Sequence, residues 1–327
     1  MLEHGGRLLQ AAQRFGIPAG QWLDLSTGVS PWPWPVPPLP APAWHRLPEE
    51  EDGLVAAAQA YYGATHLLPV AGSQAAIQAL PYLRARGRVG VIAPGYNEHA
   101  HAWRRAGHEV ITAPADVLLE TATGHDVIVL IHPNNPGGDR FAPEALLSLH
   151  DRLARRGGWL VVDEAFIDVE PAGSLCAHTG REGLIVLRSI GKFFGMAGAR
   201  AGFVFADAGL LQSLRERLGP WTLSGPTRWA VAQALADAAW QAQARPRLLA
   251  ASQRLAALLR DHGLPPQGGC GLFQWCLHPR AEALHEALAQ QGILTRWFAT
   301  PSSLRFGLPP DDAAFSRLDT ALREIAA

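Results

Sequence analysis

Apolar and polar residues follow two alternating periods along most of this chain. Short, nearly continuous apolar runs predict strands that are buried on both faces of a mostly parallel sheet. The runs lie at 89–93, 109–112, 126–131, 159–163 and 184–188. The segments between them have helical spacing, and glycine or proline marks their ends. The pattern predicts an α/β fold, with a large mostly parallel mixed sheet between helices.

The remaining segments extend this picture at both ends of the chain. A short helix is expected at 7–15 and a brief strand at 22–26, and residues 201–206 are expected to return as an antiparallel strand. Beyond Pro226 the pattern is mainly helical, and it predicts a smaller α+β unit. Its helices are expected at 226–243, 246–262, 280–291 and 311–326, and its strands at 272–277, 293–297 and 303–307.

A proline-rich stretch separates the first helix from the alternating region. Seven prolines between Pro31 and Pro42 are interleaved with Trp32, Trp34 and Val36, which keeps the backbone extended. We expect a stiff connector whose tryptophans pack on a neighbouring surface; the alternative is a PxxP-type docking ligand. The predicted division is therefore an N-terminal arm and connector (1–48), a large domain (49–225) and a small C-terminal domain (226–327).

Composition narrows the class of function. The chain has 327 residues, 48% of them hydrophobic, so it can bury a sizeable core. The formal net charge is −1 with acids and bases mixed, which disfavours a nucleic-acid surface. The sequence contains neither a signal-peptide pattern nor an 18-residue apolar run. We therefore expect a cytoplasmic protein that acts on small molecules, without membrane or nucleic-acid partners.

The cysteines do not indicate a metal or disulfide site. Cys176, Cys270 and Cys276 are too few and too irregularly spaced for a disulfide framework, and their spacing is not that of a zinc site. We interpret them as small buried hydrophobic residues.

Chemistry is expected in the loops that leave the carboxyl ends of the predicted strands, because ligands of open parallel sheets bind there. One loop holds Asn135 in an Asn-Pro-Gly turn, and another strand ends on Asp163. A small-residue turn, Gly72-Ser73-Gln74, begins a helix, where free N–H groups favour a phosphate. Each feature alone is common in proteins that lack such a site.

The fourth loop carries Lys192, the only lysine of the chain. Its neighbours Gly191, Phe193 and Phe194 are small or apolar, so desolvation is expected to lower its pKa and make it a better amine nucleophile. Such a lysine can form a Schiff base, whereas a lone lysine on a flexible loop would merely be solvated. An amine, a carboxylate, an amide and a phosphate cradle together are what a pyridoxal 5′-phosphate site requires.

These motifs resemble the fold-type I, aminotransferase class I/II family, and within it the branch of histidinol-phosphate aminotransferases and threonine-phosphate decarboxylases. The Asn-Pro-Gly turn, the Asp-Glu-Ala-Phe strand end and the Ser-x-x-Lys-x(7)-Arg loop occur in the family's order. The resemblance covers nearly the whole chain. It implies the fold of PLP-dependent transferases, a PLP-binding large domain and a homodimer.

The resemblance also implies roles for individual residues. Lys192 would hold the cofactor as a Schiff base, Asp163 would pair with the pyridine nitrogen and Asn135 with the ring hydroxyl. Tyr96 would stack on the ring, and Arg305 would bind the substrate's α-carboxylate. The residues implied to hold the cofactor's phosphate are Gly72, Ser73, Gln74, Ser189 and Arg200.

Two positions depart from the family's pattern. Phe166 stands where many relatives have a tyrosine that helps to hold the ring hydroxyl, so that hydroxyl is expected to rely on Asn135. Leu47 stands where relatives often have a tyrosine that reaches the phosphate across a dimer. Leucine cannot make that bond.

The resemblance favours one reaction without excluding others. The opening His4-Gly5-Gly6, the run Leu23-Asp24-Leu25-Ser26 and Phe166 match the decarboxylase group of cobalamin biosynthesis, and the chain is short for an aminotransferase. This implies decarboxylation of L-threonine O-3-phosphate, with His4 and Arg140 as further substrate ligands. The alternatives are an aminotransferase for a phosphorylated amino acid such as histidinol phosphate, and a non-catalytic PLP-binding protein. A nicotinamide dehydrogenase is disfavoured, because no predicted strand runs into G-x-G-x-x-G.

Overall fold

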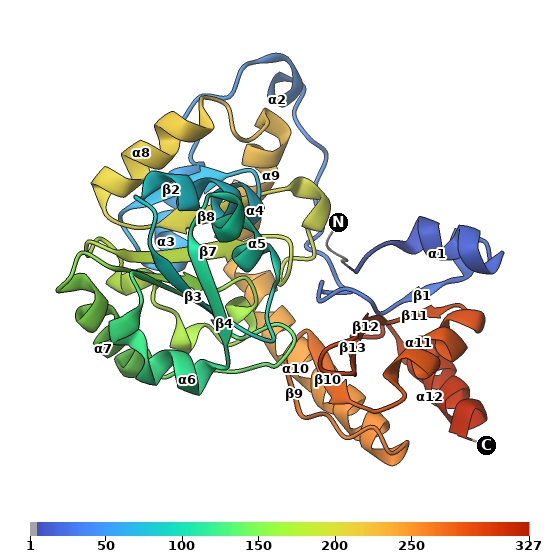
Figure 1. Ribbon diagram of the computed structural model, residues 1–327. Coiled ribbons are helices and arrows are strands. Elements are labelled where there is room, and N and C mark those ends of the chain that lie inside the picture. The colour runs from blue at the N-terminus through green and yellow to red at the C-terminus, as the bar shows by residue number, and fades with distance from the viewer. Residues whose placement is uncertain (1–4, 327) are drawn as a thin grey trace.

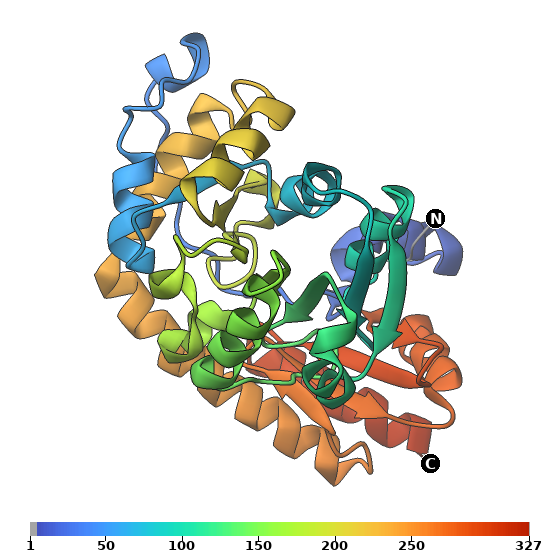
Figure 2. The same cartoon turned by 60° about the vertical axis from the view of Figure 1, so that its left-hand side comes forward.

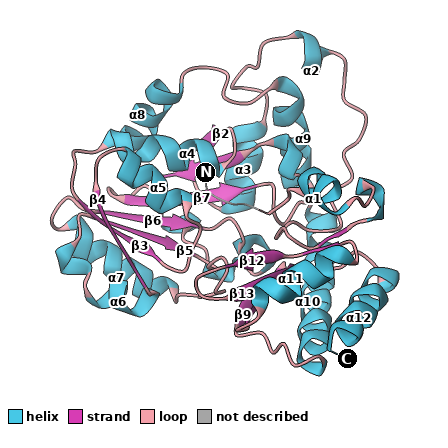
Figure 3. Ribbon diagram, turned by 45° about the vertical axis from the view of Figure 1, so that its right-hand side comes forward, coloured by secondary structure: helices cyan, strands magenta, loops and turns pink. Residues whose placement is uncertain are grey.

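A seven-stranded sheet forms the centre of the larger part of the molecule in the computed structural model, which describes residues 5–326. The strand order is β2-β8-β7-β6-β5-β3-β4, and β8 runs in the direction opposite to the other six strands. Figure 3 shows these strands between helices on both sides. The strands are β2 (Leu67–Val70), β3 (Arg88–Ile92), β4 (Glu109–Ala113), β5 (Val127–Ile131), β6 (Trp159–Asp163), β7 (Leu184–Ser189) and β8 (Gly202–Phe205).

Two hydrophobic cores cover the two faces of this sheet. Successive residues of one strand point to opposite faces, so Val127 and Val129 pack into one core while Ile128 and Leu130 pack into the other. This explains why the central strands are nearly continuous apolar runs. The helices of this part are α3 (Leu54–Tyr62), α4 (Ser73–Ala79), α5 (Glu98–Arg105), α6 (Ala115–Glu120), α7 (Pro143–Ala154), α8 (Ala208–Leu218) and α9 (Gly225–Ala236).

A four-stranded antiparallel sheet, in the order β12-β13-β10-β9, forms the smaller part. The long helix α10 (Ala238–Asp261) contacts both β10 and the large part, and it runs along the outside of the molecule (Figure 2). The elements are β9 (Gly268–Cys270), β10 (Phe273–Leu277), α11 (Ala281–Gln290), β11 (Ile293–Leu294), β12 (Arg296–Phe298), β13 (Ser303–Gly307) and α12 (Asp312–Ala326).

The N-terminal elements lie beside this smaller part (Figure 1). Strand β1 (Leu23–Asp24) pairs in parallel with β11, and α1 (Leu8–Phe15) contacts α11. Helix α9, which begins at residue 225, packs instead on α3 of the large part. The domain boundaries at residues 48 and 225 stay a prediction. The contacts place α1 and β1 against the smaller part and α9 against the larger part.

The proline-rich connector is extended, as predicted, up to a short helix α2 (Pro42–His45) that the sequence pattern did not indicate. Trp34 is buried and its Nε1 donates to Asp237 at 3.0 Å. Trp32 is partly buried, and its Nε1 donates to the carbonyl of Pro310 at 2.8 Å. The tryptophans therefore fix the connector to α10 and to the segment before α12.

Two predicted elements differ from the structure. Strand β4 is not buried on both faces: it is the edge of the sheet, and its residues are exposed or partly buried. The helices expected at 226–243 and 246–262 instead divide at Asp237, whose carboxylate caps α10 by accepting from the N–H of Trp240. Pro246 therefore lies inside α10 and does not end a helix.

The burial of the cysteines agrees with their interpretation as small hydrophobic residues. All three cysteines are free and buried. Among the described residues, no helix has both the length and the apolar character needed to span a membrane, and no group of three or more potential metal ligands is found.

Candidate active site

The candidate site lies where the carboxyl ends of β5, β6 and β7 meet. Asn135 follows β5, Asp163 ends β6 and Lys192 follows β7. Because Ile131 pairs with Asp163 and Asp163 with Leu187, the strand ends bring the three side chains to one edge of the sheet. A cavity of about 250 Å³ opens there. Its lining includes Gly5, Thr27, Gly28, Tyr96, Asn135, Lys192, Arg296, Phe298 and Arg305.

Asp163 is a buried carboxylate with two fixed hydrogen bonds. Its Oδ1 accepts from the N–H of Ala165 at 3.0 Å, and its Oδ2 lies 2.9 Å from Nε2 of His99 on α5. His99 is also buried. The Asp163 carboxylate is thus held in one orientation by the backbone N–H of Ala165 and by the imidazole ring of His99 on α5. His99 was not among the site residues expected from the sequence, although it lies only three residues after Tyr96.

Lys192 faces the cavity from a loop that is otherwise packed with phenylalanines. Its Nζ lies 5.3 Å from the centre of the Phe166 ring, so the position that often holds a tyrosine presents an aromatic face instead. Burial, followed by the nearby Arg305, lowers the pKa of Lys192 to about 8, while Asp163 opposes the shift. The amine is therefore uncharged in about a tenth of the molecules at pH 7, far more often than an ordinary lysine.

Arg305 is a buried cation held by neutral oxygens. One terminal nitrogen donates to Oδ1 of Asn135 at 2.5 Å and the other to the carbonyl of Ser26 at 2.7 Å. The first bond fixes the Asn135 amide with its oxygen towards Arg305 and its N–H groups directed elsewhere. Burial and the nearby Arg296 lower the pKa of Arg305 to about 10. The site therefore carries positive charge that an anionic ligand would compensate.

A second arginine faces the same cavity. Arg296 on β12 stands directly opposite Arg305 on β13, and both line the cavity. Like charges opposite one another across a sheet are destabilising unless an anion lies between or beside them. The position of Arg296 could not be found from sequence, because only the pairing of β12 with β13 places it at the cavity.

The residues expected to hold a phosphate also meet. A Cβ on Gly72 would lie 3.0 Å from a terminal nitrogen of Arg200, so this guanidinium lies close to the Gly72 backbone. Ser189 pairs with Gly202, and the backbone N of Ser73 lies 2.6 Å from the Cβ position of Gly202. The backbone at the start of α4, Ser189 and Arg200 therefore lie close together.

Gln74 and Tyr96 are joined in a separate chain of hydrogen bonds. The Tyr96 hydroxyl donates to Oε1 of Gln74 at 3.1 Å, and Nε2 of Gln74 donates to Glu98 at 2.9 Å. Burial, followed by Glu98, raises the pKa of Tyr96 to about 12, so its phenol stays protonated. The side chain of Gln74 thus orients the Tyr96 ring at the wall of the cavity.

Two further predicted residues are not placed at the site. His4 lies outside the described residues. Arg140 does not line the cavity: it pairs with Glu170 at 2.8 Å and donates to the carbonyls of Gly138 and Gly269. Through these bonds Arg140 ties the loop after β5 to β9.

A comparison with known families decides the assignment of the chain. The model of the aminotransferase class I and II family matches residues 50–318. The chain belongs to this family. This membership agrees with the fold that was expected from the sequence.

Individual relatives place the chain within the class I and II family. It is 59% identical over 325 residues to a threonine-phosphate decarboxylase of Pseudomonas aeruginosa, covering 98% of this chain and 97% of the relative. It is 43% identical over 327 residues to one of a Sinorhizobium species, with 98% and 97% covered. A histidinol-phosphate aminotransferase structure from Sinorhizobium meliloti, in complex with pyridoxal-5′-phosphate, superposes with a TM-score of 0.86 at 20% identity, covering 100% of this chain and 98% of that chain. That structure supports the fold.

Proposed function

We propose that this protein is a PLP-dependent carboxy-lyase that converts L-threonine O-3-phosphate to (R)-1-amino-2-propanol phosphate and CO₂. The observation that carries this proposal is the 59% identity, over nearly the full length, to a threonine-phosphate decarboxylase. The site supplies the physical support, because its charges and donors suit both the cofactor and a doubly anionic amino acid.

The residues of the site fit pyridoxal 5′-phosphate. Lys192 is the chain's only side-chain amine, and it lies beside the buried carboxylate of Asp163 and the fixed amide of Asn135. The backbone of Gly72 and Ser73, with Ser189 and Arg200, offers N–H, hydroxyl and guanidinium donors to a phosphate. Because Phe166, beside Lys192, has no hydroxyl, Asn135 is the residue that we assign to the ring hydroxyl.

When bound, the cofactor provides an electron sink for the pair of electrons left on the substrate's Cα. The residues around it determine which charges and protons are available. Asp163, held by His99 and Ala165, presents an anion that keeps a proton on the pyridine nitrogen. Lys192 can hold a proton on Nζ and deliver it to Cα in place of the departing CO₂, because its lowered pKa of about 8 lies close to neutral pH.

Two arginines suit the two anionic groups of the substrate. The forked guanidinium of Arg305 matches the planar α-carboxylate, and we assign it to that group. Arg296, opposite Arg305 on the neighbouring strand, is the cation we assign to the substrate's phosphate. His4 stays a proposed phosphate ligand, whereas Arg140 does not.

Incubation of the purified holoenzyme with L-threonine O-3-phosphate tests this function. We expect release of CO₂ and formation of the amino alcohol phosphate without any 2-oxoacid. A strict requirement for a 2-oxoacid acceptor would support the alternative aminotransferase and contradict the proposal. Binding of the cofactor without turnover of either threonine phosphate or histidinol phosphate would favour a non-catalytic PLP-binding protein.

The setting of this activity is also a proposal. We infer a cytoplasmic homodimer that acts in cobalamin biosynthesis. Three free buried cysteines suit a reducing compartment. The dimer is supported by large exposed apolar side chains on and near the connector, namely Val36, Trp44, Leu47 and Trp221.

A further inference from the structure

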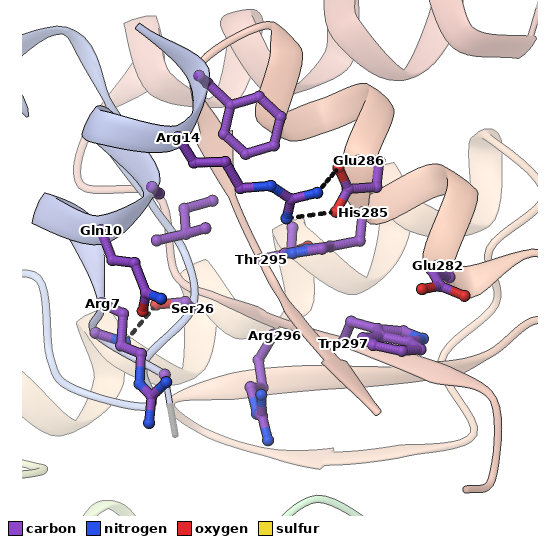
Figure 4. A pocket seen from close by; sticks show the side chains of 15 residues that line it. Arg7, Gln10, Arg14, Ser26, Glu282, His285, Glu286, Thr295, Arg296 and Trp297 are labelled. Atoms are coloured by element: carbon purple, nitrogen blue, oxygen red, sulfur yellow. Dashed lines mark hydrogen bonds and ion pairs between the residues drawn. The ribbon is translucent and has the colours of Figure 1, made fainter. Parts of the chain in front are cut away.

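Two sequence motifs that lie outside the cofactor site meet in the structure. The N–H of Gly6 donates to Oγ of Ser26 at 2.7 Å. The hydroxyl and the N–H of Ser26 both donate to Oδ1 of Asp24, at 2.6 Å and 2.9 Å. Figure 4 shows Ser26 below α1 with the bond from the N-terminal turn. The Ser26 hydroxyl therefore joins the Gly5–Gly6 turn to Asp24.

The carbonyl of the same serine contacts the substrate-binding arginine. It accepts from Arg305 at 2.7 Å, and the backbone of Gly5 packs directly against it. A Cβ on Gly5 would lie 2.2 Å from this oxygen, so any side chain there would push the carbonyl away. The position of the Ser26 peptide thus depends on Asp24 on one side and on the Gly5–Gly6 turn on the other.

Arg305 has few other groups to orient it. Its terminal nitrogens donate to Asn135 and Ser26, both neutral, and its buried Nε lacks a hydrogen-bond partner within the described part of the chain. The negative charge of Asp24 raises the pKa of Arg305 and so opposes the lowering by burial. If the Ser26 carbonyl moved, one terminal nitrogen of Arg305 would lose its acceptor. The guanidinium would then no longer be held in a fixed orientation for binding a carboxylate.

We propose that Ser26 is a positioning residue for the substrate's α-carboxylate, acting through Arg305, and that the Gly5–Gly6 turn holds it in place. This inference rests on the proposed role of Arg305 in substrate binding. Gly5 lines both the active-site cavity and a neighbouring cavity of about 280 Å³ below α1, as does Arg296. The turn therefore forms part of the wall of the substrate site and also sets the orientation of its arginine.

The test compares Ser26→Ala with Ser303→Ala. Ser303 is also a buried serine, and its hydroxyl donates to the carbonyl of Pro301, away from the N-terminal turn. Because the lost bonds weaken ground-state and transition-state binding alike, Ser26→Ala is expected to raise KM for threonine phosphate about fivefold to tenfold and to leave kcat within about twofold. Ser26→Thr, which keeps the hydroxyl, is expected to restore most of the loss.

A second variant tests the contact between the Gly5–Gly6 turn and the Ser26 carbonyl without changing Ser26. Gly5→Ala places a methyl group against the Ser26 carbonyl and is expected to raise KM in the same way. Gly20→Ala is its control, because a Cβ at Gly20 meets nothing within 4 Å. If Ser26→Ala and Gly5→Ala have the KM of their controls, the inference is wrong.

Amide hydrogen exchange separates this inference from the proposed function. Ser26→Ala is expected to speed exchange at the Gly6 amide at least about tenfold, because its acceptor is removed, whether or not the substrate is correctly identified. If the wild-type protein releases no CO₂ from threonine phosphate, the proposed function fails. If it releases CO₂ while neither KM nor Gly6 exchange responds to Ser26→Ala, the inference alone fails.

Discussion

Asp163 shows how the site depends on single side chains outside the recognised motifs. The carboxylate is buried, and one of its two oxygens is held by His99 alone among the hydrogen bonds described. A buried carboxylate that loses a partner either moves or takes up a proton, and both changes weaken its pairing with a pyridine nitrogen. The strength of cofactor binding is therefore expected to depend on a histidine of α5.

The variant His99→Ala tests this dependence. We expect the dissociation constant of pyridoxal phosphate to rise about tenfold, which corresponds to the loss of one charge-assisted hydrogen bond of about 1.4 kcal/mol. Equilibrium titration of the cofactor-free protein measures it. His150→Ala is the control, because His150 is buried on α7 and bonds the carbonyl of Glu182 instead. Equal affinities of the two variants would contradict the role of His99.

Lys192 gives a prediction about pH. Its pKa of about 8 means that the amine loses its proton as the pH rises through 8, and only the neutral amine is a nucleophile. The rate at which cofactor-free protein captures pyridoxal phosphate should therefore rise with a midpoint near pH 8 and level off about one unit above it. Absorbance of the bound cofactor follows this rate. A rate that keeps rising towards pH 10 would mean an ordinary lysine.

At the scale of residues, sequence could predict those groups that follow a strand or belong to a local motif. Lys192, Asp163 and Asn135 are of this kind, and the structure brings them together. His99 and Arg296 could not be predicted, because an approach of α5 and a cross-strand pairing place them at the site. His4 lies outside the described residues, and nothing local in the sequence indicates the pairing of Arg140 with Glu170.

At the scale of elements, a buried ion-pair network fixes the ends of two strands. Arg188 on β7 pairs with Glu164, which follows β6, and with Asp168 in the next turn, and all three side chains are buried. The carboxylate of Glu164 also accepts from Ser174 and from the N–H of Leu175. The network thereby anchors the loop that carries Phe166 beside Lys192. Sequence alone did not reveal it, because the charges are separated along the chain.

The variant Arg188→Met is expected to lower the free energy of unfolding by about 3–5 kcal/mol, because it leaves buried carboxylates without their cation. Urea denaturation of the holoenzyme measures the change. Arg88→Met provides the control, since Arg88 is exposed and its ion pair with Glu109 contributes at most about 1 kcal/mol. A loss no greater than that of the control would contradict the importance of the network.

Element boundaries were predicted best where apolar periodicity and glycine or proline agree. The central strands are buried on both faces and were therefore plain in the sequence. The prediction was wrong for β4, because a strand's place at the edge is set by its neighbours, and for α10, where the Asp237 cap outweighs Pro246 as a boundary signal.

At the scale of the whole molecule, the connector gives a prediction about assembly. Trp44 and Leu47 are exposed by 65% and 66%, so a partner surface would gain from covering them. If the proposed homodimer uses this surface, replacing both residues with serine will shift the sedimentation coefficient from that of a dimer towards that of a monomer. Leu9→Ser on α1 is the control, because Leu9 is exposed by 77% on another element. An unchanged dimer would place the interface elsewhere.

The large-scale architecture was predictable because each strand and helix carries its own periodic pattern. How the first 48 residues distribute could not be predicted, since β1 is only two residues long and finds its partner β11 near the other end of the chain. This long-range pairing brings Gly5, Ser26 and Thr27 to the site. The proposed substrate site is therefore built by both ends of the chain, whereas the predicted cofactor site belongs to the large sheet.

The fate of the hydrogen on the substrate's Cα tests the central claim most directly. Decarboxylation breaks the bond from Cα to the carboxyl carbon and leaves that hydrogen in place, whereas transamination removes it. With L-threonine O-3-phosphate deuterated at Cα, we predict an amino alcohol phosphate that keeps one deuterium on the carbon bearing nitrogen, together with one CO₂ per product. Loss of the deuterium with the carboxyl group retained would show that another bond of Cα is broken, and would contradict the proposed function.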